Sequence, residues 1–391
     1  MGDQENARIL YARPTIFVDA ARANDTGDGL TWATAKKTIN GAKVVAAASH
    51  CILIGPGTYT EQVDLGSLDD LLVRGASGAH LTYANAAATY TLKLGSRTTV
   101  EGLRISLTQA SGNQSYAVCA QEESDVELRD CRIDSVEAGV GFYDCALTRL
   151  ERCTIQGVAY GVYAFNLASC PFEAAQQTCT VRDCRIIVSG TGTWGSDGIL
   201  LGSVAGIVRG TQVYVKSTTA LFANALGIGA YLAGGSTAQT PRTTVIDGCT
   251  VTVYSTTAPY VGAIYASAVG VVVSRTAIHT ATGGNPAYDL YATGGGEITC
   301  EGCALDEAKT SGTVTYLRPA GAGVAEINVD STGGELTLAK ALEVIVARCV
   351  GDLTYSSETG VATFKGRDAQ TPVATVQLTG GGNRTGSSIP D

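Results

Sequence analysis

A pattern of nine residues that recurs eight times along the middle of the chain constrains the fold more than any other feature. In the copy at residues 126–134, apolar residues alternate up to Leu128, and the alternation then shifts by one position to Cys131 and Ile133. Asp130 is the residue at which the alternation shifts. The corresponding residues of the eight copies are Gly102, Asp130, Arg152, Asp183, Gly210, Gly248, Arg275 and Gly302. Because the apolar residues keep the same columns in every copy, the copies are repeats of one structural unit.

The residue at the shift marks a point where the chain must turn. Glycine occupies it four times and aspartate twice, and these residues tolerate a positive φ better than most. Each copy therefore predicts a short strand, a sharp bend and a second short strand. Successive bends lie 22 to 38 residues apart, and a unit of this size buries its apolar face only by stacking on its neighbours. The prediction is an all-β solenoid, a parallel β-helix, in which each repeat forms one turn.

A third strand precedes the repeated pattern in each full turn. Two apolar residues separated by one position mark it, as in Val118 and Ala120, and these side chains are expected to point inward. The residues between the inward pairs then face outward: Cys119, Gly141, Tyr163, Leu200, Gly229, Tyr265 and Tyr291. The candidate surface for subunit packing or for stacking on glycans consists of Tyr163, Leu200, Tyr265 and Tyr291. The alternative is that small residues are merely tolerated on the wall of the solenoid.

The amino-terminal part of the chain predicts a helical cap. Trp32, Ala35, Ile39, Ala42 and Ala46 recur at steps of three and four residues, which is the spacing of one apolar helix face. A helix laid across the open end of a solenoid would cover the apolar core of the first turn and block its edge from further pairing. We therefore expect this helix to close the β-helix.

Three segments at this end also carry a resemblance. Phe17–Asp19, Asp28–Ala35 and Gly55–Tyr59 resemble the beginning of pectin-lyase-like right-handed β-helix proteins, which include pectate lyases, polygalacturonases, bacterial surface proteins and phage tailspikes. The resemblance covers about residues 15–305 and implies a right-handed parallel β-helix. Since this fold hosts many activities, the resemblance alone does not select one.

The repeat ends after Leu305, and a different module follows. Helix formers at residues 336–348, then three strand-like runs, predict a small α+β module of a helix and a hairpin. Residues 363–368 and 382–385 resemble carboxy-terminal modules of bacteriophage structural proteins. The predicted organisation is an N-terminal arm at 1–14, a strand, capping helix and first turn at 15–60, the parallel β-helix at 61–310, and a C-terminal assembly module at 311–391.

Charge and hydropathy exclude some partners. The net charge of −9, without a clustered basic face, argues against binding nucleic acid or an anionic membrane surface. No apolar run reaches 18 residues, which argues against membrane insertion, and the first residues lack a basic and apolar leader.

The cysteines and one acidic loop are the parts of the sequence whose side chains are typical metal ligands. At least five of the 12 cysteines fall in inward columns, so we expect reduced core thiols. Cys300 and Cys303 have the spacing of a metal or redox pair, but no second pair completes a site. Residues 24–29 have the spacing of a calcium loop, yet Ala35 stands where a closing glutamate is needed, so a plain turn is expected. We predict no metal and no cofactor.

Catalytic residues are scarce on the expected outer face. In the polysaccharide-cleaving members of the resembled family, outward residues of this strand build the site; a glycosidase needs two carboxyls and a lyase needs a base. Of the outward positions and those just before the inward pairs, only Asp289 supplies a carboxylate. We therefore assign no catalytic residue, and interpret His279 as a surface histidine. One enzymatic option uses Glu173, in an excursion at 166–178, or Asp197.

Both resemblances favour a non-enzymatic virion structural protein of a bacteriophage, such as a spike, fibre or capsid decoration. Such a protein would assemble as a homotrimer in the bacterial cytoplasm, where thiols stay reduced, and would contact other virion proteins and bacterial surface polysaccharide. The alternative is a phage depolymerase, a hydrolase or lyase that cleaves capsule or cell-wall glycan. A bacterial surface adhesin is a third option.

Overall fold

A computed structural model describes residues 13–84, 89–109, 115–167, 169–190, 196–218, 225–232, 243–256, 258, 261–282 and 286–317, and four strands between 353 and 388. The chain divides into two compact units, Met1–Glu326 and Ile327–Asp391. The long interval between Ile228 and Cys249 predicts a loop at about 232–242, and nearly all of it lies outside the described residues. The predicted arm up to residue 12 and the predicted helix at 336–348 lie outside them as well.

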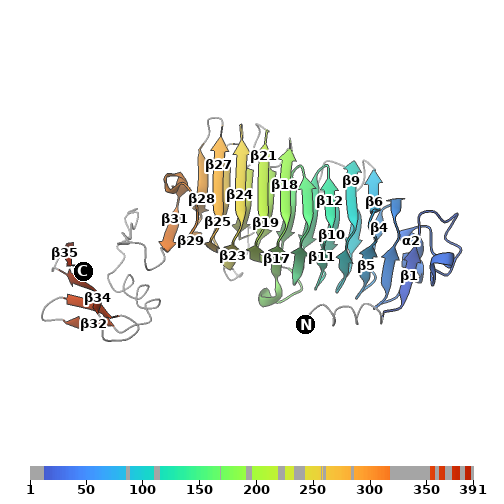
Figure 1. Ribbon diagram of the computed structural model, residues 1–391, viewed down its shortest axis with the longest axis horizontal. Coiled ribbons are helices and arrows are strands. Elements are labelled where there is room, and N and C mark those ends of the chain that lie inside the picture. The colour runs from blue at the N-terminus through green and yellow to red at the C-terminus, as the bar shows by residue number, and fades with distance from the viewer. Residues whose placement is uncertain are drawn as a thin grey trace. The chain divides into compact units, whose positions relative to one another are not determined.

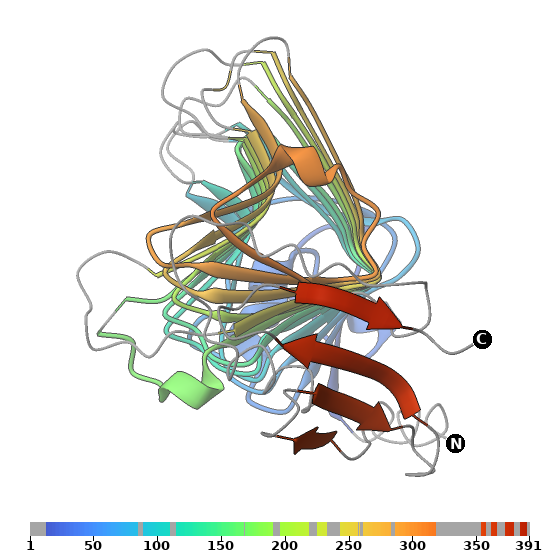
Figure 2. The same ribbon diagram turned by 90° about the vertical axis from the view of Figure 1, so that its left-hand side faces the viewer.

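The first unit is a right-handed parallel β-helix built from three sheets, which Figure 2 shows as three sides of one coil. All pairings within these sheets are parallel, and strands of consecutive turns are stacked in sequence order, as Figure 1 shows from β1 to β31. In each turn the chain passes through the three sheets in the same order, and a bend separates the second sheet from the third. The predicted fold class is therefore confirmed.

Sheet A, with 12 strands, contains β1 (Thr15–Val18), β2 (Cys51–Ile54), β5 (Leu72–Gly75), β8 (Thr99–Glu101), β11 (Glu127–Arg129), β14 (Thr148–Glu151), β17 (Thr178–Arg182), β20 (Ala205–Arg209), β23 (Thr243–Asp247), β26 (Gly270–Ser274), β29 (Glu297–Glu301) and β31 (Thr313–Leu317). Sheet B, with nine strands, contains β3 (Gly57–Thr60), β6 (Ala79–Ala84), β9 (Arg104–Gln109), β12 (Arg132–Ser135), β15 (Thr154–Gly157), β18 (Arg185–Gly190), β21 (Gln212–Ser217), β24 (Thr250–Ser255) and β27 (Ala277–Thr282).

Sheet C, with ten strands, contains β4 (Val63–Asp64), β7 (Tyr90–Leu94), β10 (Tyr116–Gln121), β13 (Ala138–Tyr143), β16 (Tyr160–Phe165), β19 (Ser196–Gly202), β22 (Ala225–Tyr231), β25 (Val261–Ser267), β28 (Ala287–Thr293) and β30 (Thr310–Ser311). Short 3-10 helices occur at η1 (Trp32–Thr34), η2 (Ala174–Gln176) and η3 (Glu307–Lys309). In the second unit, an antiparallel sheet contains β32 (Leu353–Ser356), β33 (Val361–Lys365), β34 (Pro372–Leu378) and β35 (Arg384–Ser388).

The bend between sheets A and B is the residue at the shift of the repeated pattern. All eight bend residues have a positive φ, between 48° and 67°, including the two arginines. The next residue lies in the core, and in seven turns it is cysteine or threonine, whose side chain donates to the carbonyl two residues earlier: Cys131, Cys153, Cys184, Thr211, Cys249, Thr276 and Cys303. Each of these carbonyls also accepts from the amide of the bend residue in the preceding turn, as the Glu151 carbonyl does from Asp130 at 3.0 Å, so the side chain adds a second donor.

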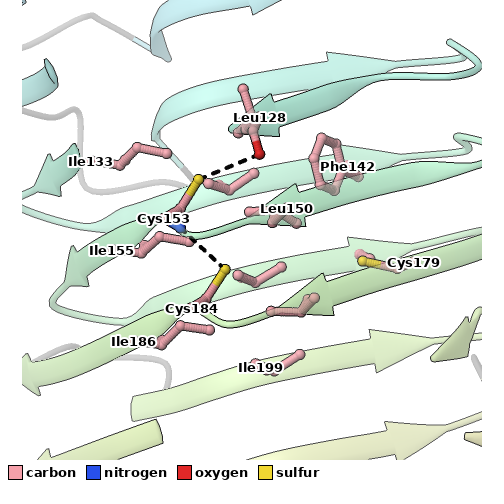
Figure 3. Close-up of a cluster of buried hydrophobic side chains, with 14 of the residues drawn as sticks. Leu128, Ile133, Phe142, Leu150, Cys153, Ile155, Cys179, Cys184, Ile186 and Ile199 are labelled. Atoms are coloured by element: carbon pink, nitrogen blue, oxygen red, sulfur yellow. Dashed lines mark hydrogen bonds between the residues drawn. The ribbon is translucent and has the colours of Figure 1, made fainter. Parts of the chain in front are cut away.

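The cysteine column is also part of the apolar core. Figure 3 shows Cys153 and Cys184 stacked beside Ile155 and Ile186, with the Cys153 amide donating to the Cys184 sulfur at 3.4 Å. All 11 cysteines of the described residues are free thiols, and most are buried. Their position in the core follows the sequence prediction.

The amino-terminal helix is shorter than predicted. The apolar stripe from Trp32 to Ala46 does not form one helix: the chain turns at η1, is extended at Ala35, and forms α2 only over Ile39–Val45. The reason is Asp25, whose carboxylate accepts from the backbone and side chain of Thr38 and fixes Thr38 as the residue that caps α2.

Parts of the predicted stripe still reach the core. Ile39 and Ala42 are buried against the first turns of the coil, whereas Trp32 is 43% exposed. Figure 1 shows α2 beside β1 at the blue end of the β-helix. A role of α2 in closing the coil remains a prediction. No helix within the described ranges has the length and apolar character needed to span a membrane.

Candidate binding face on sheet C

The predicted outward residues of sheet C do form one column. The strand register aligns Cys119, Gly141, Tyr163, Leu200, Gly229, Tyr265 and Tyr291 on consecutive turns. The inward residues on either side are buried at every turn, as for Val162 and Ala164. Tyr163, Leu200, Tyr265 and Tyr291 are half-buried. Their use as an interface or a glycan surface remains a prediction.

Aromatic rings from neighbouring columns surround Tyr163. Its ring stacks on Phe165, with centroids 5.8 Å apart and planes inclined by 7°, and lies 5.5 Å from the Tyr143 ring and 5.1 Å from the Tyr160 ring. Tyr231 extends this group, because its ring lies 6.3 Å from that of Phe165. We call Tyr116, Tyr143, Tyr160, Tyr163, Phe165 and Tyr231 the aromatic cluster.

The other two predicted tyrosines belong to a separate group. The Tyr265 and Tyr291 rings lie 5.6 Å apart, and Tyr291 stacks on Tyr288 at 4.7 Å. Leu200 and Gly229 occupy the outward column between Tyr163 and Tyr265. The sequence therefore predicted Leu200 and three of the aromatic residues of this face but missed the aromatic residues in the flanking columns. These aromatic residues could have been found in the sequence, because each lies two or three positions along the chain from a residue of the predicted outward column.

From β10 to β28, the described strands of sheet C carry one outward carboxyl group, that of Asp197, and it is buried; the earlier strands β4 and β7 add Asp64 and Lys93 to the outward column. Asp197 precedes Leu200 on β19 and is only 5% exposed, and its Oδ1 accepts from the Leu226 amide of the next turn at 3.1 Å. Burial raises the pKa of Asp197 to about 8, while the Leu226 hydrogen bond lowers it by a smaller amount. Asp197 therefore carries a proton at neutral pH. The enzymatic option from the sequence treated Asp197 as a loop carboxylate, whereas the structure places it on the strand β19.

The residues just before the inward pairs do not face outward. This column contains Ala117, Gly139, Gly161, Gly198, Gly227, Ala263 and Asp289. A Cβ added at Gly198 would overlap Cγ1 of Val213, which lies on sheet B across the core. Two successive residues of each strand thus point inward, and strict alternation along the strand predicted the wrong side for the first of them.

Asp289 belongs to this inward column. It is 1% exposed and lies inside the last turns, where its Oδ1 accepts from the Thr280 hydroxyl at 2.6 Å and its Oδ2 from the Asp306 amide at 2.8 Å. The carboxylate is held by structural hydrogen bonds. It is therefore not on the outer face, and the sequence prediction of Asp289 as an outward carboxylate was wrong.

The remaining candidates lie apart from this face or have other contacts. Glu173 is exposed in the connection from β16 to β17, and His279 is exposed on sheet B. The Asp28 carboxylate accepts from the Leu30 amide and the Thr34 hydroxyl, as in an ordinary turn. Cys300 is buried, and Cys303 follows the last bend. Within the described residues, no group of three or more histidine, cysteine or acidic side chains could hold a metal ion.

Comparison with known proteins supports the fold. Residues 34–207 match a family described as right handed beta helix region. The structure is similar to pectate lyase Pel9A, with a TM-score of 0.52, 11% identity, and coverage of 78% of this chain and 79% of that one. A pectin methylesterase from carrot gives a TM-score of 0.44 at 13% identity over 78% and 89% of the two chains. No curated protein matches the sequence.

At identities this low, structural similarity reflects the backbone and carries no information about substrate. The family match covers the early and middle turns, and the pectate lyase has a similar coil over most of its length. The chain is therefore a right-handed parallel β-helix protein of the pectin-lyase-like fold.

Proposed function

We propose that this chain is a non-enzymatic virion structural protein of a bacteriophage that assembles as a homotrimer through the outer face of sheet C. The observation that carries the proposal is the composition of that face from β10 to β28: aromatic rings, small residues and, in the described strands, one carboxyl group that is neutral at pH 7. Such a surface loses little polar hydration when another subunit covers it. It also offers rings of the kind that stack on sugars.

Two further features support assembly inside a bacterial cell. The free thiols in the core fit a protein that folds in a reducing cytoplasm before release. The resemblance of residues 363–368 and 382–385 to modules of phage structural proteins favours a virion component. Other virion proteins and bacterial surface polysaccharide are the proposed partners of the assembled trimer.

Light scattering of the full chain at micromolar concentration tests the trimer. The expected mass is that of three chains. A double variant Tyr265→Asp and Tyr291→Asp places charges on the outer face of sheet C and is expected to yield monomers. Its matched control is Tyr214→Asp with Tyr254→Asp, because these two exposed tyrosines lie on neighbouring strands of sheet B. A monomeric wild-type protein, or equal dissociation of both double variants, would overturn the proposal.

The environment of Asp197 favours a second candidate, a polysaccharide depolymerase. A carboxyl group that keeps its proton near neutral pH beside tyrosine side chains has the property required of a general acid. Incubation with a panel of bacterial surface polysaccharides would produce new reducing ends or unsaturated products, and Asp197→Asn would abolish them. Such a result would replace the non-enzymatic function, whereas intact polysaccharides would leave the structural role standing.

A further inference from the structure

Three arginines that form no ion pair within the described residues lie close together on the outer face of sheet A. Arg149, Arg182 and Arg209 come from the consecutive strands β14, β17 and β20, and all three are exposed. None of them forms an ion pair with a carboxylate of the described residues. Two neighbouring arginines do: Arg129 pairs with Glu127 at 2.8 Å and Arg152 with Asp130 at 2.8 Å.

The strand register places two of these charges in direct opposition. Arg182 and Arg209 are partners in the pairing of β17 with β20, and Arg149 is opposite Thr180, two residues before Arg182. Paired strands lie about 4.8 Å apart, and like charges at opposing positions destabilise a sheet. An arrangement of this kind is relieved when an anion lies between the guanidinium groups.

The arginines also border a hollow that could hold such an anion. Arg149, Arg182 and Arg209 line a cavity of about 390 Å³ together with Glu127, Arg129, Leu150, Glu151, Thr180 and Ile207. Four arginines against two glutamates give this cavity a formal charge of +2. The whole chain carries −9, so the cavity is a local exception on an acidic protein.

Acidic residues on both sides limit the length of the ligand. In the strand register, Arg149 is opposite Glu127 on β11, Arg182 is opposite Glu151 on β14, and Arg209 is opposite Asp247 on β23. The three arginines that add the excess positive charge of the cavity thus extend over three strands, or about 10 Å from the first to the third. A compact anion fits this length, and a long continuous polyanion would meet carboxylates at both ends.

We propose that this cavity binds a phosphate group of diphosphate size, either free or carried by a larger molecule. The planar guanidinium forms two parallel hydrogen bonds with phosphate oxygens, and such charge-assisted pairs are stronger than neutral hydrogen bonds. Three guanidinium groups on adjacent turns present several donors to one face of the ligand. The site is on a different sheet from the aromatic cluster and does not depend on the proposed assembly.

Calorimetric titration of the full chain with inorganic pyrophosphate at low ionic strength tests the site. We expect saturable binding with one ligand per chain, accompanied by an increase in the melting temperature. The double variant Arg182→Gln with Arg209→Gln is expected to lose at least tenfold in affinity. In the absence of ligand it should melt no lower than wild type, because the substitution removes two opposed charges.

The matched control is Arg104→Gln with Arg132→Gln. These two arginines also lie opposite each other on consecutive turns, on sheet B, but both pair with Asp134. The control removes the same charge and should bind pyrophosphate within twofold of wild type. Equal losses in the two double variants, or no binding to the wild-type chain, would overturn the proposal.

Two further ligands establish the size and source of the phosphate. A nucleoside diphosphate should compete with pyrophosphate if the site accepts a phosphate carried by a larger molecule, and lack of competition would restrict it to the free ion. Heparin, a sulfated polymer, should bind at least tenfold more weakly per chain than pyrophosphate. Binding of heparin alone would contradict the diphosphate-sized site.

Discussion

The outer faces of sheets C and A are built on the same backbone and carry opposite chemistry. Both are parallel ladders of consecutive turns. Sheet C carries stacked rings around a buried, neutral Asp197, whereas sheet A carries rows of arginine and glutamate that are exposed or half-buried. The difference teaches that the coil restricts only its inward columns. The outward columns of each sheet are free to specialise, since they contribute little to the core.

The inward side explains why such different faces can coexist. Each turn fills the coil with the same columns of valine, isoleucine, leucine and cysteine. Apolar burial of this kind is the main favourable term in folding. Substitutions should therefore have large effects where side chains are buried, on either face, and small effects where they are exposed.

The largest expected effect concerns Asp197 and depends on pH. Its folded-state pKa of about 8 is above the ordinary value of 3.8, so the folded protein keeps a proton that the unfolded chain releases. Stability should therefore fall as pH rises from about 4 to about 8 and then level off. Asp197→Asn cannot ionise and should increase the free energy of unfolding at pH 8 by on the order of 4 kcal/mol.

Urea denaturation of both proteins at pH 5 and pH 8 measures this effect. Glu173→Gln is the control, because Glu173 is exposed and its loss should leave the pH dependence intact. If the free energy of unfolding of Asp197→Asn has the same pH dependence as that of wild type, Asp197 is not the group that couples stability to pH.

The second effect concerns the column of sheet C that contains Gly198, which also points into the core. A Cβ at Gly198 would lie 2.5 Å from the Gly227 carbonyl oxygen and would overlap a methyl group of Val213. Gly198→Ala should therefore cost about 3 kcal/mol by overpacking. Gly270→Ala on sheet A is the control, since the nearest atom to its Cβ, Oγ1 of Thr243, would be 3.6 Å away. Similar melting temperatures for the two variants would contradict the inward assignment.

The third effect concerns the aromatic cluster. Tyr116 is 3% exposed, and its hydroxyl is hydrogen-bonded to that of Tyr143. Burial raises the pKa of the Tyr116 phenol well above its ordinary value, so the group stays neutral. Tyr116→Phe should cost about 1 kcal/mol through the lost hydrogen bond. The exposed Tyr214 on sheet B gives the comparison, and Tyr214→Phe should leave thermal denaturation unchanged.

The smallest effect concerns the charged rows of sheet A. Arg74 Nε lies 3.6 Å from Glu101 Oε2 on the next turn, and both side chains are partly exposed. Arg74→Gln should change stability by less than about 0.5 kcal/mol, because solvent screens such pairs. Denaturation in low and high salt measures it. A loss as large as that of Tyr116→Phe would remove the distinction between the two faces.

The sequence by itself determined the repeat, its bends and its core. The bend residues could be predicted because glycine and aspartate at a fixed position report a local backbone requirement, and all eight bends have the expected positive φ. The inward pairs of sheet C could be predicted because apolar alternation is a local property of a strand. A second set of residues with positive φ could not be predicted from the sequence, because no single residue type marks it. Its members are Glu122, Asp144, Ser203 and Ala268.

Only the tertiary structure decided which residues meet across turns. Connections between strands differ in length, so the spacing along the chain does not reveal that Phe165 meets Tyr231 or that Arg182 lies opposite Arg209. Burial is likewise a property of the assembled coil. Asp197 and Asp289 look alike in the sequence, yet one is a neutral acid beneath outward rings and the other an internal hydrogen-bond acceptor, because each strand turns two successive residues inward.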